Sequence, residues 1–136
     1  MSAAFFIVLD REEPGFDTFV NGKSLAKDYE TLEMVAGSLG LRPLGEYISY
    51  SPEEAREMME ELGTDPDEIE GMELPEKRWY DPQEGLDWVQ KVCAHLEANP
   101  SAVKNTEGVL ADLEEYRNVL EQAKAAGARW CLQGDF

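Results

Sequence analysis

Two helix-start signals with the same residue pattern constrain the fold of this chain more than any other feature. Residues 51–54 read Ser-Pro-Glu-Glu, and residues 81–84 read Asp-Pro-Gln-Glu. In each signal a polar side chain caps free backbone N–H groups, proline takes the first helical position, and glutamate completes a capping box. The first helix is expected to end at Gly63. The second is expected to run to about Asn99 before Pro100.

Two more helices follow from apolar spacing. Residues 25–39 carry apolar side chains at helical intervals, with Ser24 as the candidate cap and Gly40 as the stop. The last helix is expected to begin at Asn105 or Thr106 and to end at Gly127, with its apolar residues on one face.

Strands are predicted near both chain ends. Residues 5–9 form an apolar, largely aromatic and β-branched run, which favours a strand covered on both faces. Turn-forming residues follow at 10–15. Residues 128–132 are expected to form the closing strand. Residues 44–50 and the pair 79–80 are candidates for two further short strands.

The element order predicts the α+β class. We expect residues 1–136 to form one compact domain, a usual size for a domain. Its small sheet should hold about 3–4 strands, both chain ends included, with about four helices packed against it. The alternative is a mainly helical domain with a marginal sheet.

The charge excludes some classes of partner. The chain has 29 acidic and 12 basic side chains and a formal net charge of −17. Direct binding to nucleic acid or to an anionic membrane is disfavoured, because both need clustered lysine and arginine. The N-terminal residues lack the basic region and long apolar core of a signal peptide, and no stretch is long enough to span a bilayer. Cys93 and Cys131 are expected to be reduced thiols in a cytoplasmic protein.

Most of the negative charge lies in residues 51–76, which we call the acidic segment. It holds eleven acidic side chains and one basic one, a net charge of −10. Such a concentration of negative charge creates a negative electrostatic potential, which attracts basic partners. A solvated face with no partner is the alternative. Calcium is disfavoured because Pro66 and Ile69 interrupt the ligand spacing of a calcium loop. The candidate partner-binding acids are Glu57, Glu60, Glu61, Asp65, Asp67 and Glu68.

Three aromatic residues are candidate anchors for the same partner. Trp79, Tyr80 and Trp88 lie within ten positions, and tryptophan and tyrosine are frequent anchors at interfaces. The competing interpretation places this wide apolar arc in the core, with His95 at its edge. A third possibility is that the stripe around Val92 and Trp88 is buried in a homodimer.

Catalytic motifs are missing. His95 is the only histidine, and Cys93 points away from it on the same predicted helix. One histidine and two cysteines do not complete a zinc site, and no glycine-rich phosphate loop is present. The pattern therefore disfavours an enzyme and predicts neither a cofactor nor a metal.

These observations favour a small acidic cytoplasmic protein-interaction module that binds a basic protein. Immunity and inhibitor proteins are the physical model, because fast inhibition of a basic target rewards a strong negative potential. Three alternatives stay open: a small-molecule-binding protein or enzyme with a pocket near the aromatic residues, a structural homodimer subunit, and a nucleic-acid mimic.

Overall fold

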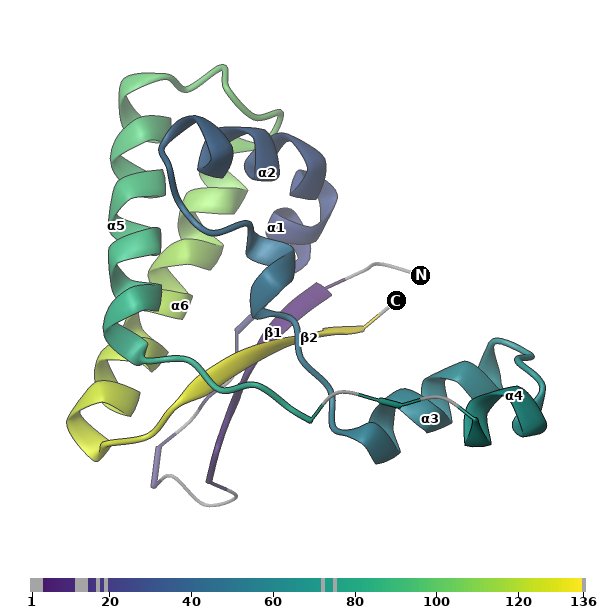
Figure 1. The fold of residues 1–136 in the computed structure, drawn as a ribbon. Coiled ribbons are helices and arrows are strands. Elements are labelled where there is room, and N and C mark those ends of the chain that lie inside the picture. The colour runs from purple at the N-terminus through teal and green to yellow at the C-terminus, as the bar shows by residue number, and fades with distance from the viewer. Residues whose placement is uncertain are drawn as a thin grey trace.

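The computed structural model describes residues 4–11, 15–16, 18, 20–71, 73–74 and 76–135. Helices and two terminal strands make up these residues, so the α+β class is confirmed (Figure 1). The elements in chain order are β1 (Ala4–Leu9), α1 (Lys23–Lys27), α2 (Tyr29–Ser38), the 3-10 helix η1 (Leu44–Tyr47), α3 (Pro52–Glu61), α4 (Pro66–Glu70), α5 (Pro82–Ala98), α6 (Thr106–Ala126) and β2 (Trp130–Asp135). Residues 12–14 of the predicted turn lie outside the described residues.

The two ends of the chain pair as antiparallel strands. Leu9 lies opposite Trp130, and Phe5 lies opposite Gly134. The predicted sheet of three to four strands is wrong in number, since the described residues form a two-stranded sheet. The side chains of β1 alternate between buried and half-buried, so one of its faces is only partly covered. The expectation of a strand covered on both faces is therefore wrong as well.

The sequence predicts a strand over residues 44–50, but residues 44–47 form the short helix η1. The carboxylate of Glu33 accepts hydrogen bonds from the backbone N–H groups of Leu44 and Gly45, which stabilises the start of η1. The residues after η1 contact the sheet without forming a strand: Ile48 makes an isolated bridge to Leu132, whose carbonyl accepts the N–H of Ser49. The pair 79–80 contributes in the same limited way, through one bridge from Tyr80 to β2.

The predicted caps of α3, α5 and α6 are confirmed. The predicted cap Ser24 is wrong, because α1 begins at Lys23 after Gly22 and Ser24 lies inside the helix. Ser51 and Glu54 form the complete predicted capping box. Asp81 caps α5 by accepting the backbone N–H of Gln83, but Glu84 pairs with Arg42 and does not complete the box predicted there. Asn105 accepts the N–H of Gly108 at the start of α6. That helix ends at Gly127, whose positive φ of 71° glycine adopts without steric cost.

The predicted helix over 25–39 is divided into α1 and α2 at Asp28. The buried side chain of Asp28 accepts the backbone N–H of Asn105 at the start of α6. In return, Asp112 of α6 accepts the N–H groups of Ser24 and Leu25 at the start of α1. These two buried carboxylates fasten α1 and α2 to α6, since each satisfies N–H groups that a helix end leaves free.

The core lies between the sheet and the long helices α5 and α6, which pack side by side (Figure 1). Alternate residues of β1 face this core, together with the buried faces of both helices. Its largest fully buried side chains include Tyr47, Leu96, Leu113, Leu120 and Leu132. In the described part of the chain, no helix combines the length and apolarity needed to cross a membrane.

Candidate protein-interaction surface

The acidic segment forms a unit that projects from the rest of the molecule. Helices α3 and α4 extend to the right in Figure 1, away from α5 and α6. No residue of α3 is buried, and Ile69 is the one buried residue of α4. Helix α4 was not predicted: Asp65 caps it and Pro66 occupies its first turn. Most of the acidic segment therefore lies at the surface.

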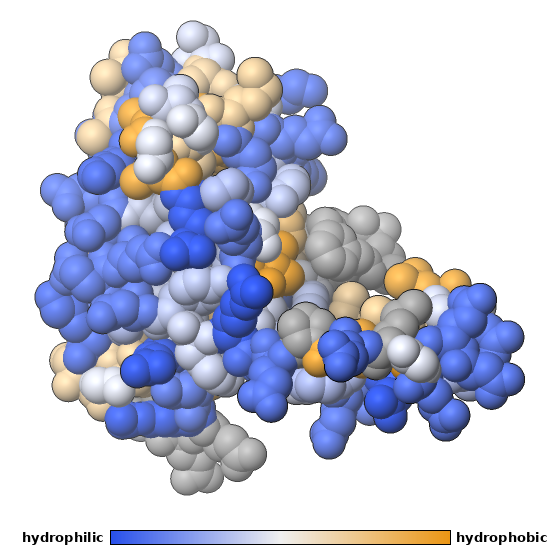
Figure 2. All heavy atoms as spheres, in the orientation of Figure 1, coloured by the Kyte–Doolittle hydropathy of each residue, from blue (hydrophilic) through white to orange (hydrophobic). Residues whose placement is uncertain are grey.

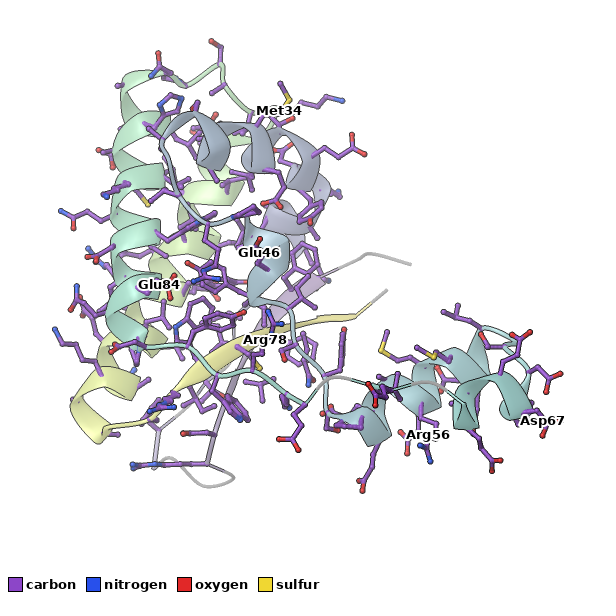
Figure 3. All side chains as sticks on the ribbon, in the orientation of Figure 1. Met34, Glu46, Arg56, Asp67, Arg78 and Glu84 are labelled. Carbon is purple, nitrogen blue, oxygen red and sulfur yellow. The ribbon has the colours of Figure 1, made fainter. Side chains whose placement is uncertain are left out.

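All six candidate acids lie on this projecting unit and are exposed. Glu57, Glu60 and Glu61 lie on α3. Asp65 caps α4, and Asp67 and Glu68 lie in its first turn, where negative charge is favourable. Figure 3 shows Asp67 at the outer end of the unit and Arg56 on the lower side of α3. The six carboxylates thus lie close together along the chain on one projecting unit.

Glu54 anchors α3 to the body of the molecule. Its Oε1 accepts the backbone N–H of Ser51 at 3.1 Å and pairs with Lys77 Nζ at 3.1 Å. Its Oε2 accepts a hydrogen bond from Gln133 of β2 at 2.9 Å. Burial by itself raises the pKa of Glu54, but the hydrogen bonds from Ser51, Lys77 and Gln133 favour the ionised form and lower the pKa to about 2.

A groove separates α3 from the end of β2. It has a volume of about 550 Å³ and is lined on one side by α3 and on the other by Tyr50 and Gly134. Met58 and Leu62 provide apolar side chains, and Leu62 is 83% exposed. Figure 2 shows orange apolar atoms along the upper edge of the projecting unit. The lining residues from α3 are Glu54, Glu57, Met58 and Glu61, and Leu62 lines the groove directly after the helix.

The three aromatic candidates do not lie on the acidic segment. Trp88 is only 3% exposed, and its indole N–H donates to the carbonyl of Arg42 inside the core. Tyr80 is buried too, and its hydroxyl donates to the carbonyl of Glu46. Neither offers an accessible anchor. Val92 is fully buried inside the chain, so the stripe that it forms with Trp88 offers no surface to a second copy.

Trp79 is half-buried and lines a different groove. This groove has a volume of about 600 Å³ and runs along the less covered face of β1, next to Phe6 and Val8. Its charged lining groups have partners: Asp10 accepts the N–H of Arg129, and Lys77 lies over the Trp79 ring while pairing with Glu54.

The two thiols are poorly suited to nucleophilic chemistry. Burial raises the pKa of Cys93 and of Cys131 to about 11 in each case, so the thiolate is scarce at neutral pH. Cys131 contacts the carbonyl of Ser49, and its charged neighbours are Lys77 and Glu54. Among the described residues, no group of three or more histidine, cysteine or acidic side chains is arranged to hold a metal.

The groove residues Tyr50, Met58 and Leu62 were not among the sequence candidates. A signal was present, because Met58 and Leu62 are four residues apart and lie on one face of a helix whose start was predicted. The position of Tyr50 opposite that face depends on the fold. The chain matches no protein-family model, no curated protein and no solved structure.

Proposed function

We propose that this chain is a protein-interaction module that binds a basic protein through the acidic segment. The observation that carries the proposal is the exposure of six carboxylates on one projecting unit, α3 and α4, with a net charge of −10 over residues 51–76. Charges presented together on a protruding surface raise the rate of encounter with an oppositely charged partner.

The role of an immunity or inhibitor protein fits this surface. An inhibitor gains from fast association, which a concentrated negative potential provides. Glu54 also anchors α3 to the body of the molecule. This favours tight binding, because a surface that is already held in place loses less conformational entropy when it binds. We place this activity in the cytoplasm, and the free thiols of Cys93 and Cys131 support a reducing compartment.

The test compares two variants of equal net charge. The first replaces three exposed acids of α3 by glutamine, Glu57, Glu60 and Glu61 (E57Q/E60Q/E61Q). The matched control replaces three exposed acids of α2, α5 and α6, Glu30, Glu97 and Glu121 (E30Q/E97Q/E121Q). Each chain is immobilised, and captured basic proteins are identified and quantified at low salt and at about 1 M salt, where the Debye length is about 3 Å.

The wild-type chain should retain a specific basic protein at low salt and release it at high salt. The α3 variant should lose most of this binding, while the control variant keeps it, because the effect depends on where the charges lie. Equal losses in the two variants would show a general effect of net charge and would contradict the proposed surface. So would the absence of any salt-sensitive basic partner.

A further inference from the structure

We propose that the groove between α3 and the end of β2 receives an amphipathic, basic α-helix of the partner protein. This inference deepens the proposed function, because it names the element that the partner presents and the contact that gives specificity. It depends on the shape and chemistry of the groove in addition to the charge of the segment.

One face of α3 lines the groove with apolar and acidic side chains. The α3 side of the lining comprises positions 54, 57, 58, 61 and 62, the spacing of a single helical face. Met58 and Leu62 form the apolar part, and Glu57 and Glu61 flank it with exposed carboxylates. Methionine adapts its shape to a partner surface more readily than branched residues do. The opposite wall carries the ring of Tyr50.

The backbone of the opposite wall decides between a helical and an extended ligand. An extended peptide binds by adding a strand, which requires free N–H and C=O groups at a sheet edge. Along the described outer edge of β2, Trp130 exchanges two hydrogen bonds with Tyr80, and the carbonyl of Leu132 accepts the N–H of Ser49. At Gly134, the hydroxyl of Tyr50 accepts the N–H and donates to the carbonyl. The groove thus offers side chains to a ligand, as helix recognition requires.

The acidic side chains that flank the groove favour a partner helix with basic side chains. Leucine-like side chains on one face would contact Met58 and Leu62, and lysine or arginine on its flanks would meet Glu57 and Glu61. A second copy of this chain is a poor occupant, because it brings another acidic segment of charge −10 to the same place.

The binding experiment uses two labelled synthetic peptides of about 18 residues, long enough to form a helix on binding. The first places leucine at helical intervals and lysine elsewhere. The second has the same composition with the leucines distributed around the helix. Fluorescence anisotropy gives the affinity of the full chain for each, and circular dichroism reports helix formation. We expect the amphipathic peptide to bind about tenfold more tightly and to become helical, since it buries its leucines together.

Two variants with the same added charge test the apolar contact. Leu62→Asp alters the groove, whereas Met34→Asp alters α2 at a residue that is 76% exposed. Both side chains are exposed, so each variant should fold, and thermal melting checks this. L62D should weaken the binding of the amphipathic peptide by about tenfold, because the substitution removes an apolar contact. The extra negative charge of the variant would by itself favour the basic peptide. M34D should leave the affinity within about twofold.

The outcomes separate this inference from the proposed function. Equal affinity for the two peptides, no effect of L62D, or binding without helix formation would overturn the helix-in-groove inference. The proposed function would still stand if E57Q/E60Q/E61Q lost the basic partner while its control did not. Tight binding of the amphipathic peptide, lost in L62D, would support the groove whatever protein supplies the helix.

Discussion

At the scale of single residues, Glu54 makes more stabilising contacts than its position in an acidic run suggests. It closes the capping box of α3, pairs with Lys77 and contacts Gln133 of β2. The neighbouring Glu53 is exposed in the same first turn. Two adjacent glutamates thus differ because only one faces the body of the molecule.

Replacing Glu54 by alanine should destabilise the chain by about 1–2 kcal/mol, through loss of the cap and of charge-assisted hydrogen bonds. The pKa of Glu54 is lowered from 4.5 to about 2 in the folded chain, so its contribution is present above pH about 4.5 and is lost as the pH falls toward 2. Urea unfolding across this range should show the wild type converging on E54A. The control E53A should follow the wild type, and a pH-independent gap between wild type and E54A would contradict this role.

At the scale of elements, the contact between α5 and β2 depends on a glycine. A Cβ atom at Gly85 would lie 2.6 Å from the ring of Trp130 and 3.0 Å from Leu120. Trp130 has little freedom to move, because it is buried, stacks on Tyr47 and donates its indole N–H to the carbonyl of Asp81. The absence of a side chain at position 85 therefore lets helix and strand approach.

Alanine at two helical glycines should have opposite effects on stability. Gly85→Ala should destabilise the chain by about 1–2 kcal/mol, since overpacking outweighs the gain in helix propensity. Gly37→Ala in α2 should stabilise it by about 0.5–1 kcal/mol, because nothing lies within 4 Å of the added Cβ. Denaturant unfolding midpoints of the two variants measure the effects. Stabilisation by both would show that Trp130 adapts and that the contact is not tight.

At the scale of the whole molecule, the uneven charge works against folding stability. The acidic segment gathers −10 of the formal net charge of −17 into 26 consecutive residues, where the carboxylates repel one another. Salt at about 0.15 M shortens the Debye length to about 8 Å and screens this repulsion.

The melting temperature should therefore rise with added sodium chloride. Between about 0.01 M and 0.15 M we expect a rise of about 2–5 °C, which corresponds to roughly 1 kcal/mol of relieved repulsion. The rise should be smaller in E57Q/E60Q/E61Q than in E30Q/E97Q/E121Q, because only the first variant dilutes the charge of α3. A salt-independent melting temperature would contradict the electrostatic explanation.

Sequence reasoning located the elements whose signals are local. Capping residues predicted the starts of α3, α5 and α6, because a cap satisfies N–H groups within its own turn. The prediction that both chain ends lie in one small sheet is confirmed, and the structure adds that the two strands pair directly. The excess of acidic residues in 51–76 needed no structure, and their general exposure was expected because dense charge in one stretch is seldom buried.

Only the tertiary structure decided what depends on distant partners. Asp28 divides a predicted helix because it reaches α6, and Glu33 holds residues 44–47 in a helical turn in place of a strand. Trp88 is a core residue and Leu62 an exposed one, the reverse of what residue type suggests for an interface anchor. The groove exists because Tyr50 and the end of β2 lie opposite α3. Local signals specify where helices begin, whereas long-range hydrogen bonds and packing specify which faces remain open to a partner.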